Sequence, residues 1–256
     1  MTEWLTTPPG QYLLQWERAC LLAAVADVFG FHALQLGLPE LEILSANRMP
    51  HRWVALDHSG GLSSELVTDF AALPFPEQSL DLVVLPHTLE LNADPHGVLR
   101  EVARVLVPEG KVVITGFNPM SLWGQAQQRA RLYQRVGFGQ NFLPEPVKPL
   151  GYWRLRDWLR LLNLELDQAN SHFGCFRPAL RSQAWLERFS GIDRVGSRWW
   201  PILGSVYMLV AVKRQHGMTL HSPVRAAKPR VATAPVSVAN RRKTCSDNKP
   251  VMKEPA

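Results

Sequence analysis

The sequence has few cysteines, and none of them stands in a recognisable pattern. The 256 residues contain three, Cys20, Cys175 and Cys245, which are widely scattered and form no C-x-x-C pair. An odd, dispersed set of this kind does not indicate a disulfide framework. We therefore expect a reduced, cytoplasmic protein.

Long apolar runs are missing as well. The best apolar stretch near the N-terminus, 19–29, follows Glu17 and Arg18 and contains Asp27. It is too short to span a bilayer and has no basic segment leading into it. We expect neither a secretory signal nor a transmembrane segment.

The first 215 residues lack any excess of one charge. Residues 216–256 contain eight basic and two acidic side chains, which equals the whole net charge of +6, so 1–215 are neutral. The segment 216–256 is rich in Pro, Ala, Ser, Lys and Arg and shows no periodicity, which is typical of a disordered tail. Such a tail could contact polyanions weakly through its charge alone.

What remains has an ordinary globular balance, with 46% hydrophobic and 20% charged residues in the whole chain. Gly10 and Gly30 bracket an amphipathic helix at 11–29, for which we expect a buried face of Leu14, Ala19, Leu22, Val25 and Val28 or Phe29. We predict further helices at 94–106, 121–135, 154–162 and 180–189, and strands at 32–36, 53–56, 65–69, 80–85, 111–117, 164–169 and 206–212.

The clearest unit lies in the middle of the chain. LDLVVL at 80–85 is a near-continuous branched apolar run, as a parallel strand covered on both faces requires. Asp94 and Pro95 then cap a helix, and KVVITGF at 111–117 is the next strand. A strand, a helix and a strand in this order predict one parallel crossover and an α/β fold.

The block VTDFAALPFPEQSLDLVVLPHTLELNADPHGVLREVARVLVPEGKVVI, residues 67–114, carries a resemblance. It resembles the type 11 group of class I S-adenosylmethionine-dependent methyltransferases. PHTLE at 86–90, GFNPMSLWG at 116–124 and the final stretch 198–214 resemble, more narrowly, a proteobacterial group of methyltransferase-like proteins. The resemblance implies a Rossmann-like fold with a seven-stranded, mostly parallel sheet, an antiparallel last strand and helices on both faces.

The resemblance also implies a cofactor site for S-adenosylmethionine at the carboxyl ends of the strands. Gly37 matches the glycine turn after the first strand, although Gln35, Leu38, Pro39 and Glu40 replace the usual Asp and later glycines. Three further residues match cofactor-binding positions: Asp57 for the ribose hydroxyls, Asp69 for the adenine amine, and Phe70 for the adenine ring. Turn or cap roles are the alternatives for the two aspartates.

His87 follows the fourth predicted strand, beside the methyl group in proteins of this family. We predict it as the catalytic residue, acting as a base, and as a cofactor contact. Structural hydrogen bonding is the alternative, and a metal pair with Glu90 is a third because the two share a helical face. We predict no metal site, since His96 is the only further ligand nearby.

Two functions remain open at this stage. The first is methyl transfer from S-adenosylmethionine to a small-molecule or lipid-like acceptor. The second is a non-catalytic binding or regulatory protein on the same scaffold, which the altered glycine loop favours. For the domains we predict an N-terminal helix (1–30) packed on a methyltransferase-like domain (31–215), followed by the tail (216–256).

Overall fold

The computed structural model describes residues 1–57, 66–134, 141–144, 147–180, 182–189 and 191–214. Residues 1–215 form one compact unit. The predicted tail, 216–256, lies outside the described residues, as does the stretch 58–65.

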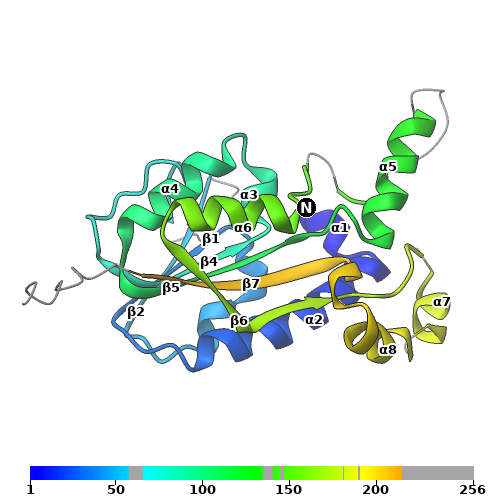
Figure 1. Ribbon diagram of the computed structural model, residues 1–256, viewed down its shortest axis with the longest axis horizontal. Coiled ribbons are helices and arrows are strands. Elements are labelled where there is room, and N and C mark those ends of the chain that lie inside the picture. Colours follow the sequence, from blue (N-terminus) through cyan, green and yellow to red (C-terminus); the bar gives the residue numbers. More distant parts are fainter. Residues whose placement is uncertain (58–65, 135–140, 145–146, 181, 190, 215–256) are drawn as a thin grey trace, which may run out of the picture. The chain divides into compact units, whose positions relative to one another are not determined.

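A seven-stranded sheet forms the centre of the unit, in the order β3-β2-β1-β4-β5-β7-β6 (Figure 1). The strands are β1 (His32–Leu36), β2 (His51–Leu56), β3 (Leu66–Val67), β4 (Leu80–Pro86), β5 (Leu106–Phe117), β6 (Leu164–Gly174) and β7 (Val206–Lys213). Pairs β1–β2, β1–β4, β2–β3 and β4–β5 are parallel, whereas β7 runs antiparallel to both β5 and β6. The predicted fold class is therefore confirmed, including the antiparallel last strand.

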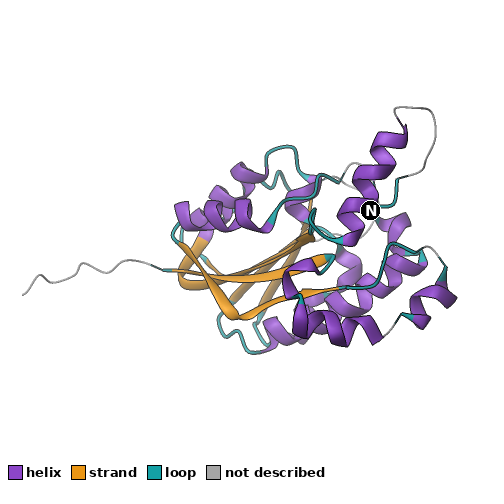
Figure 2. Cartoon of the chain, turned by 45° about the vertical axis from the view of Figure 1, so that its right-hand side comes forward, coloured by secondary structure: helices purple, strands orange, loops and turns teal. Residues whose placement is uncertain are grey.

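Helices cover both faces of the sheet (Figure 2). One face packs against α4 (Pro95–Val105) and α6 (Tyr152–Leu161), through side chains such as Val98, Val102 and Leu155. The other face packs against α2 (Pro8–Ala26) and two short 3-10 turns, η1 (Pro39–Leu41) and η2 (Ile43–Ala46). Strand β4 is buried on both faces, as its near-continuous apolar run predicts.

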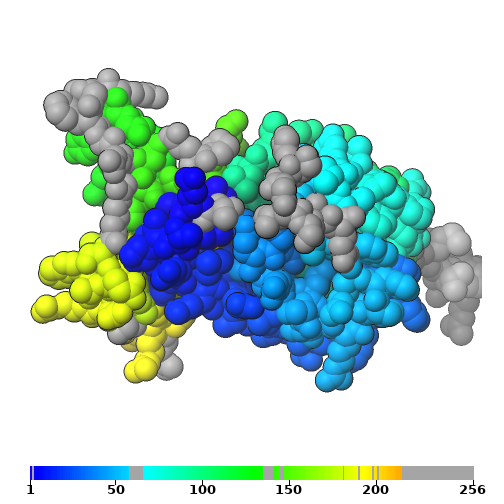
Figure 3. Space-filling model, turned by 180° about the vertical axis from the view of Figure 1, so that it is seen from behind, coloured from blue at the N-terminus to red at the C-terminus, as the bar shows by residue number. Residues whose placement is uncertain are grey.

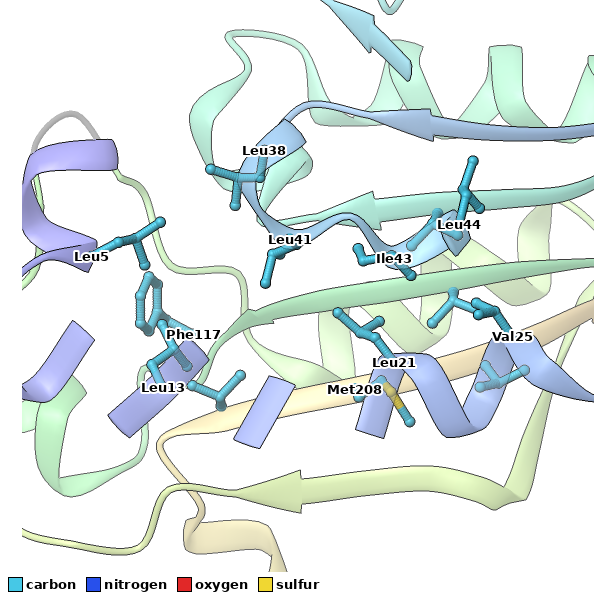
Figure 4. Packing of buried hydrophobic residues seen from close by; sticks show 14 of the residues in the cluster. Leu5, Leu13, Leu21, Val25, Leu38, Leu41, Ile43, Leu44, Phe117 and Met208 are labelled. Carbon is cyan, nitrogen blue, oxygen red and sulfur yellow. The ribbon is translucent and has the colours of Figure 1, made fainter. Parts of the chain in front are cut away.

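Helix α2 starts earlier than its predicted range and buries a different face. Thr7 caps it by accepting a hydrogen bond from Gly10 N, so the helix starts at Pro8. Leu13, Glu17, Leu21 and Val25 form its fully buried stripe, each four residues after the last; Figure 4 shows three of the four. The predicted face was wrong at Ala19, which is exposed, and right at Val25 and at Val28, the buried one of the two alternatives Val28 and Phe29. The charged residue Glu17 interrupts the apolar residues of this stripe, so the hydrophobic pattern of the sequence does not reveal the four-residue spacing of the buried face.

Other differences concern segments at the edges of the predicted elements. Strand β6 continues to Gly174, with an irregularity between Asp167 and His172. Helix α8 (Gly191–Trp199) was not predicted, whereas the final strand begins at Val206 as predicted and ends one residue later than predicted, at Lys213. The hydrophobic periodicity does not reveal three short helices, α1 (Thr2–Leu5), α3 (Thr88–Leu91) and η3 (Pro201–Leu203). Two further helices, α5 (Leu122–Gln134) and α7 (Gln183–Arg188), lie where helices were expected.

Within the described residues, no helix is both long and apolar enough to cross a bilayer.

Candidate functional site

A pocket of about 310 Å³ lies at the carboxyl ends of β1, β2 and β4. This is the edge at which doubly wound sheets bind their ligands. Its wall combines the turn after β1, the end of β2 and the turn after β4, and consists of Gly37, Leu38, Asp57, Phe70, Pro86, Thr88, Leu91 and Asn92. The volume is near the lower end of the range for small-molecule sites.

The turn after β1 is held by side-chain contacts instead of a helix. Gly37 has φ of +84° and the following Leu38 has φ of +41°, so both residues are left-handed. The amide nitrogen of Gln35 donates to the carbonyl oxygens of Gly37 (3.1 Å) and Leu38 (2.8 Å). Gln35 thus stabilises the turn from the position where the family usually has an aspartate.

Glycine is required at position 37 by backbone conformation. A Cβ there would meet only Thr88 Oγ1, at 3.6 Å, so space is not the constraint. Gly37→Ala should therefore cost about 1–2 kcal/mol of unfolding free energy, the penalty of a left-handed residue with a Cβ. Urea unfolding measures it. Gly191→Ala is the control, because a Cβ there meets nothing within 4 Å; equal losses in both variants would contradict the argument.

Three of the five predicted cofactor residues line this pocket, namely Gly37, Asp57 and Phe70. Asp69 is adjacent to Phe70 but is not part of the described wall. Its Oδ1 accepts the backbone N–H of Ala71 at 2.9 Å, which is a turn cap. The predicted adenine contact of Asp69 stays a prediction.

His87 is also absent from the described wall, and its ring is fully buried. Its Nε2 is 2.9 Å from Glu17 Oε1, and its Nδ1 is 3.0 Å from Glu90 Oε2. The contact with Glu90 is a hydrogen bond. The contact with Glu17 is an ion pair whose geometry leaves both atoms without a hydrogen-bond partner among the described residues. His87 thus lies between two buried carboxylates.

Electrostatics favours the charged form of this ring. Burial alone lowers the pKa of His87, but the carboxylates of Glu17 and Glu90 outweigh it and raise the pKa to about 10. Burial raises the pKa of Glu90 more than its contacts with His87 and two backbone amides lower it. The raised pKa values of His87 and Glu90 both favour the protonated forms of these groups. Protonation brings the net charge of the buried cluster nearer to zero. A cationic ring donates protons through both nitrogens, and the predicted roles of His87 as a base and as a cofactor contact stay predictions.

Glu90 connects this cluster to the chain on either side. Its Oε1 accepts the backbone N–H of Phe117 at 2.8 Å and that of Leu150 at 3.3 Å. Its carbonyl oxygen accepts the N–H of Lys148 at 3.0 Å. Glu90 therefore fixes the end of β5 and the approach to α6 against the turn after β4.

Sequence reasoning singled out His87 and Glu90 but missed Glu17. A signal existed: a glutamate interrupts the stripe Leu13, Leu21 and Val25 at four-residue spacing. An acidic residue at a core position must find a buried cation. As to the predicted absence of a metal site, the described residues contain no group of three or more His, Cys, Asp or Glu side chains that could hold one.

Comparisons with known proteins agree with this architecture. Residues 45–114 match the model of the family described as a methyltransferase domain. Uncharacterized protein YafS of Escherichia coli (strain K12) is 32% identical over 210 residues, which cover 81% of this chain and 79% of YafS. The chain belongs to the class I S-adenosylmethionine-dependent methyltransferase family.

Two solved structures support the fold. One is a chain from the complex of the Haloferax volcanii Trm112 methyltransferase activator with a methyltransferase (TM-score 0.54, 16% identity, covering 84% of this chain and 96% of that one). The other is an S-adenosylmethionine-dependent methyltransferase from Archaeoglobus fulgidus (TM-score 0.52, 15% identity, covering 78% and 94%). At these identities the likeness establishes the fold alone.

Proposed function

We propose that this protein transfers a methyl group from S-adenosylmethionine to a small-molecule or lipid-like acceptor in the cytoplasm. The observation that carries the proposal is the pocket lined by Gly37, Asp57 and Phe70 at the strand ends of a methyltransferase fold. The bound cofactor would supply an electrophilic methyl group, so the protein needs to contribute mainly position and orientation.

The pocket residues fit such a cofactor. The carboxylate of Asp57 at the end of β2 offers two acceptors to a vicinal diol. Phe70 and Leu91 supply apolar surface for a purine ring, and Thr88 and Asn92 supply polar groups. At Gly37 the chain turns sharply without a side chain, which leaves room beside the methionine part.

Our proposal gives His87 a positioning role. The ring is enclosed by Glu17 and Glu90, and it would have to leave both ion pairs to reach an acceptor. Its backbone, with φ of +52°, begins α3 and joins two pocket residues, Pro86 and Thr88. Holding the ring therefore holds this part of the wall.

A binding or regulatory function without catalysis is the second candidate. The observation in its favour is the turn after β1: Leu38 is buried against the core, and Pro39 begins a 3-10 turn where the family usually has glycines. Fewer backbone N–H groups are then available to the cofactor.

Calorimetric titration with S-adenosylmethionine and S-adenosylhomocysteine tests the proposal. Asp57→Asn should weaken binding about 10- to 100-fold, the effect of losing charge-assisted hydrogen bonds. The control is Asp157→Asn, an exposed acid on α6, which should change nothing. Asp69→Asn separates the two roles open to that residue, because a turn cap leaves affinity intact whereas an adenine contact does not.

Binding at micromolar concentration, lost in Asp57→Asn, supports the proposal. If S-adenosylmethionine does not bind at millimolar concentration, the proposal is wrong and the protein has only the fold of a methyltransferase. Binding without transfer to any acceptor among small amphiphiles and lipids would favour the second candidate.

A further inference from the structure

The connection between β6 and β7 is far longer than the sheet requires. These strands are antiparallel neighbours, which a hairpin of two residues can join. Here residues 175–205 intervene and fold into α7, α8 and η3. Because β6 is parallel to the first five strands, this insertion lies at the carboxyl edge of the sheet, the same edge as the pocket.

The insertion turns apolar side chains outward. On α8, Ile192, Val195 and Trp199 follow helical spacing and form one exposed stripe. Trp200, Ile202 and Leu203 extend it, and Trp199 and Trp200 are 70% and 60% exposed. We call this surface the α8–η3 ridge and define it as Ile192, Val195, Trp199, Trp200, Ile202 and Leu203.

The ridge is firmly attached to the body of the protein. Asp193, on the inner side of α8, binds the hydroxyl of Tyr12, the guanidinium of Arg177 (2.8 Å) and the backbone N–H of Phe176 (3.2 Å). Gly196 lies directly on the Phe176 ring, where a Cβ would stand only 2.5 Å from it. With this inner side fixed, the apolar stripe cannot turn inward.

The exposed charged side chains of α7 and α8 near the ridge are mainly positive. The charge of Asp193 is balanced by Arg177, whereas Glu187 accepts from the neutral amide of Gln183 and keeps its negative charge, so the exposed arginines outnumber the uncompensated acid by two to one. Arg188 and Arg194 are exposed, and Arg188 lies over the ring of Trp185, itself an exposed tryptophan. Tryptophan beside arginine is the composition of protein surfaces that insert into the headgroup region of an anionic bilayer.

We propose that the α8–η3 ridge docks the protein on the surface of an anionic lipid bilayer, with the pocket edge facing the membrane. Figure 3 shows the α7–α8 segment, in yellow, standing out from the body as a convex projection. A convex projection suits a soft lipid interface, whereas a helical peptide partner needs a groove. Docking does not depend on methyl transfer.

Vesicle sedimentation of the full chain tests this proposal, with phosphatidylcholine alone and with added phosphatidylglycerol. We expect binding to the anionic vesicles and weaker binding to the neutral ones. The double variant Val195→Glu, Trp199→Glu should bind at least about tenfold more weakly, because two apolar side chains no longer leave water.

The matched control is Leu161→Glu with Trp153→Glu. These exposed residues of α6 again comprise one aliphatic and one tryptophan, and the change in charge is identical. The control should retain vesicle binding, and both double variants should keep the melting temperature, since all four side chains are exposed.

Equal loss of binding in the control would show that net charge alone attracts the vesicles, and would overturn the proposal. So would vesicle binding that survives in the ridge variant. A concentration-dependent dimer that only the ridge variant abolishes would show that a second copy covers the ridge. Failure of any of these vesicle experiments leaves cofactor binding untouched, so the two proposals stand or fall separately.

Discussion

Replacing His87 by alanine should lower the free energy of unfolding by about 3–5 kcal/mol, the cost of leaving a buried charge without its partner. Glu17 and Glu90 would both remain buried with no cation between them. Chemical denaturation monitored by circular dichroism measures the loss.

Two further variants separate charge from backbone strain. His87→Asn keeps a residue type that tolerates the left-handed backbone at this position, so it should lose nearly as much if charge is the cause. Glu17→Leu should lose much less, because His87 and Glu90 remain as a balanced pair and leucine continues the apolar stripe of α2. A larger loss in Glu17→Leu than in His87→Ala would contradict the charge balance that we assign.

Stability should also decline as the pH rises from about 7 toward 10, the folded-state pKa of His87. A histidine whose pKa is raised by folding contributes stability that is complete below its unfolded pKa, about 6.5, and is lost as the pH rises through its folded pKa. The raised pKa of Glu90 acts in the same direction, because deprotonation again favours the unfolded chain.

The measurement is the urea midpoint of the wild type and of His87→Asn across this pH range. The wild type should show the steeper decline, and the two curves should converge at the alkaline end. If the variant does not fold, the imidazole nitrogen shifts of the wild type provide the answer by NMR. A neutral His87 ring at pH 8 would refute the assignment.

Most of the sheet could be predicted from the sequence because burial on two faces leaves a strong pattern. Strand β4 is an apolar run that only Asp81 interrupts, and the strands at 111–117 and 206–212 are also mostly apolar. Parallel order followed from the helix between β4 and β5. The short β3 and the long β6 were less well delimited, because β6 alternates little and bends at an irregularity.

The candidate site was harder to predict, for physical reasons specific to its residues. Gly37, Asp57 and Phe70 line one pocket because they follow strand ends, which sequence order reveals. Sequence order does not show how deeply a side chain is buried. His87 is polar and stands next to pocket residues in the sequence, but its ring is buried against Glu17, which lies on a helix 70 residues earlier in the chain. No local pattern around His87 indicates that contact.

Helix α8 illustrates a second limit. Its apolar stripe of Ile192, Val195 and Trp199 has helical spacing but is exposed, so periodicity does not show which side faces the core. The buried side is set by Asp193 and Gly196, a charged residue and a residue without a side chain. Neither contributes to a hydrophobic pattern.

The position of β7 has a consequence for how the chain assembles. Because β7 lies between β5 and β6, β6 cannot join the sheet during synthesis until residues 206–213 have been made. Until then the edge of β5 presents unpaired backbone N–H and C=O groups, the kind of edge that recruits strands from other molecules. A nascent or truncated chain that stops before Val206 should therefore aggregate, even though every strand of the parallel half of the sheet is already present.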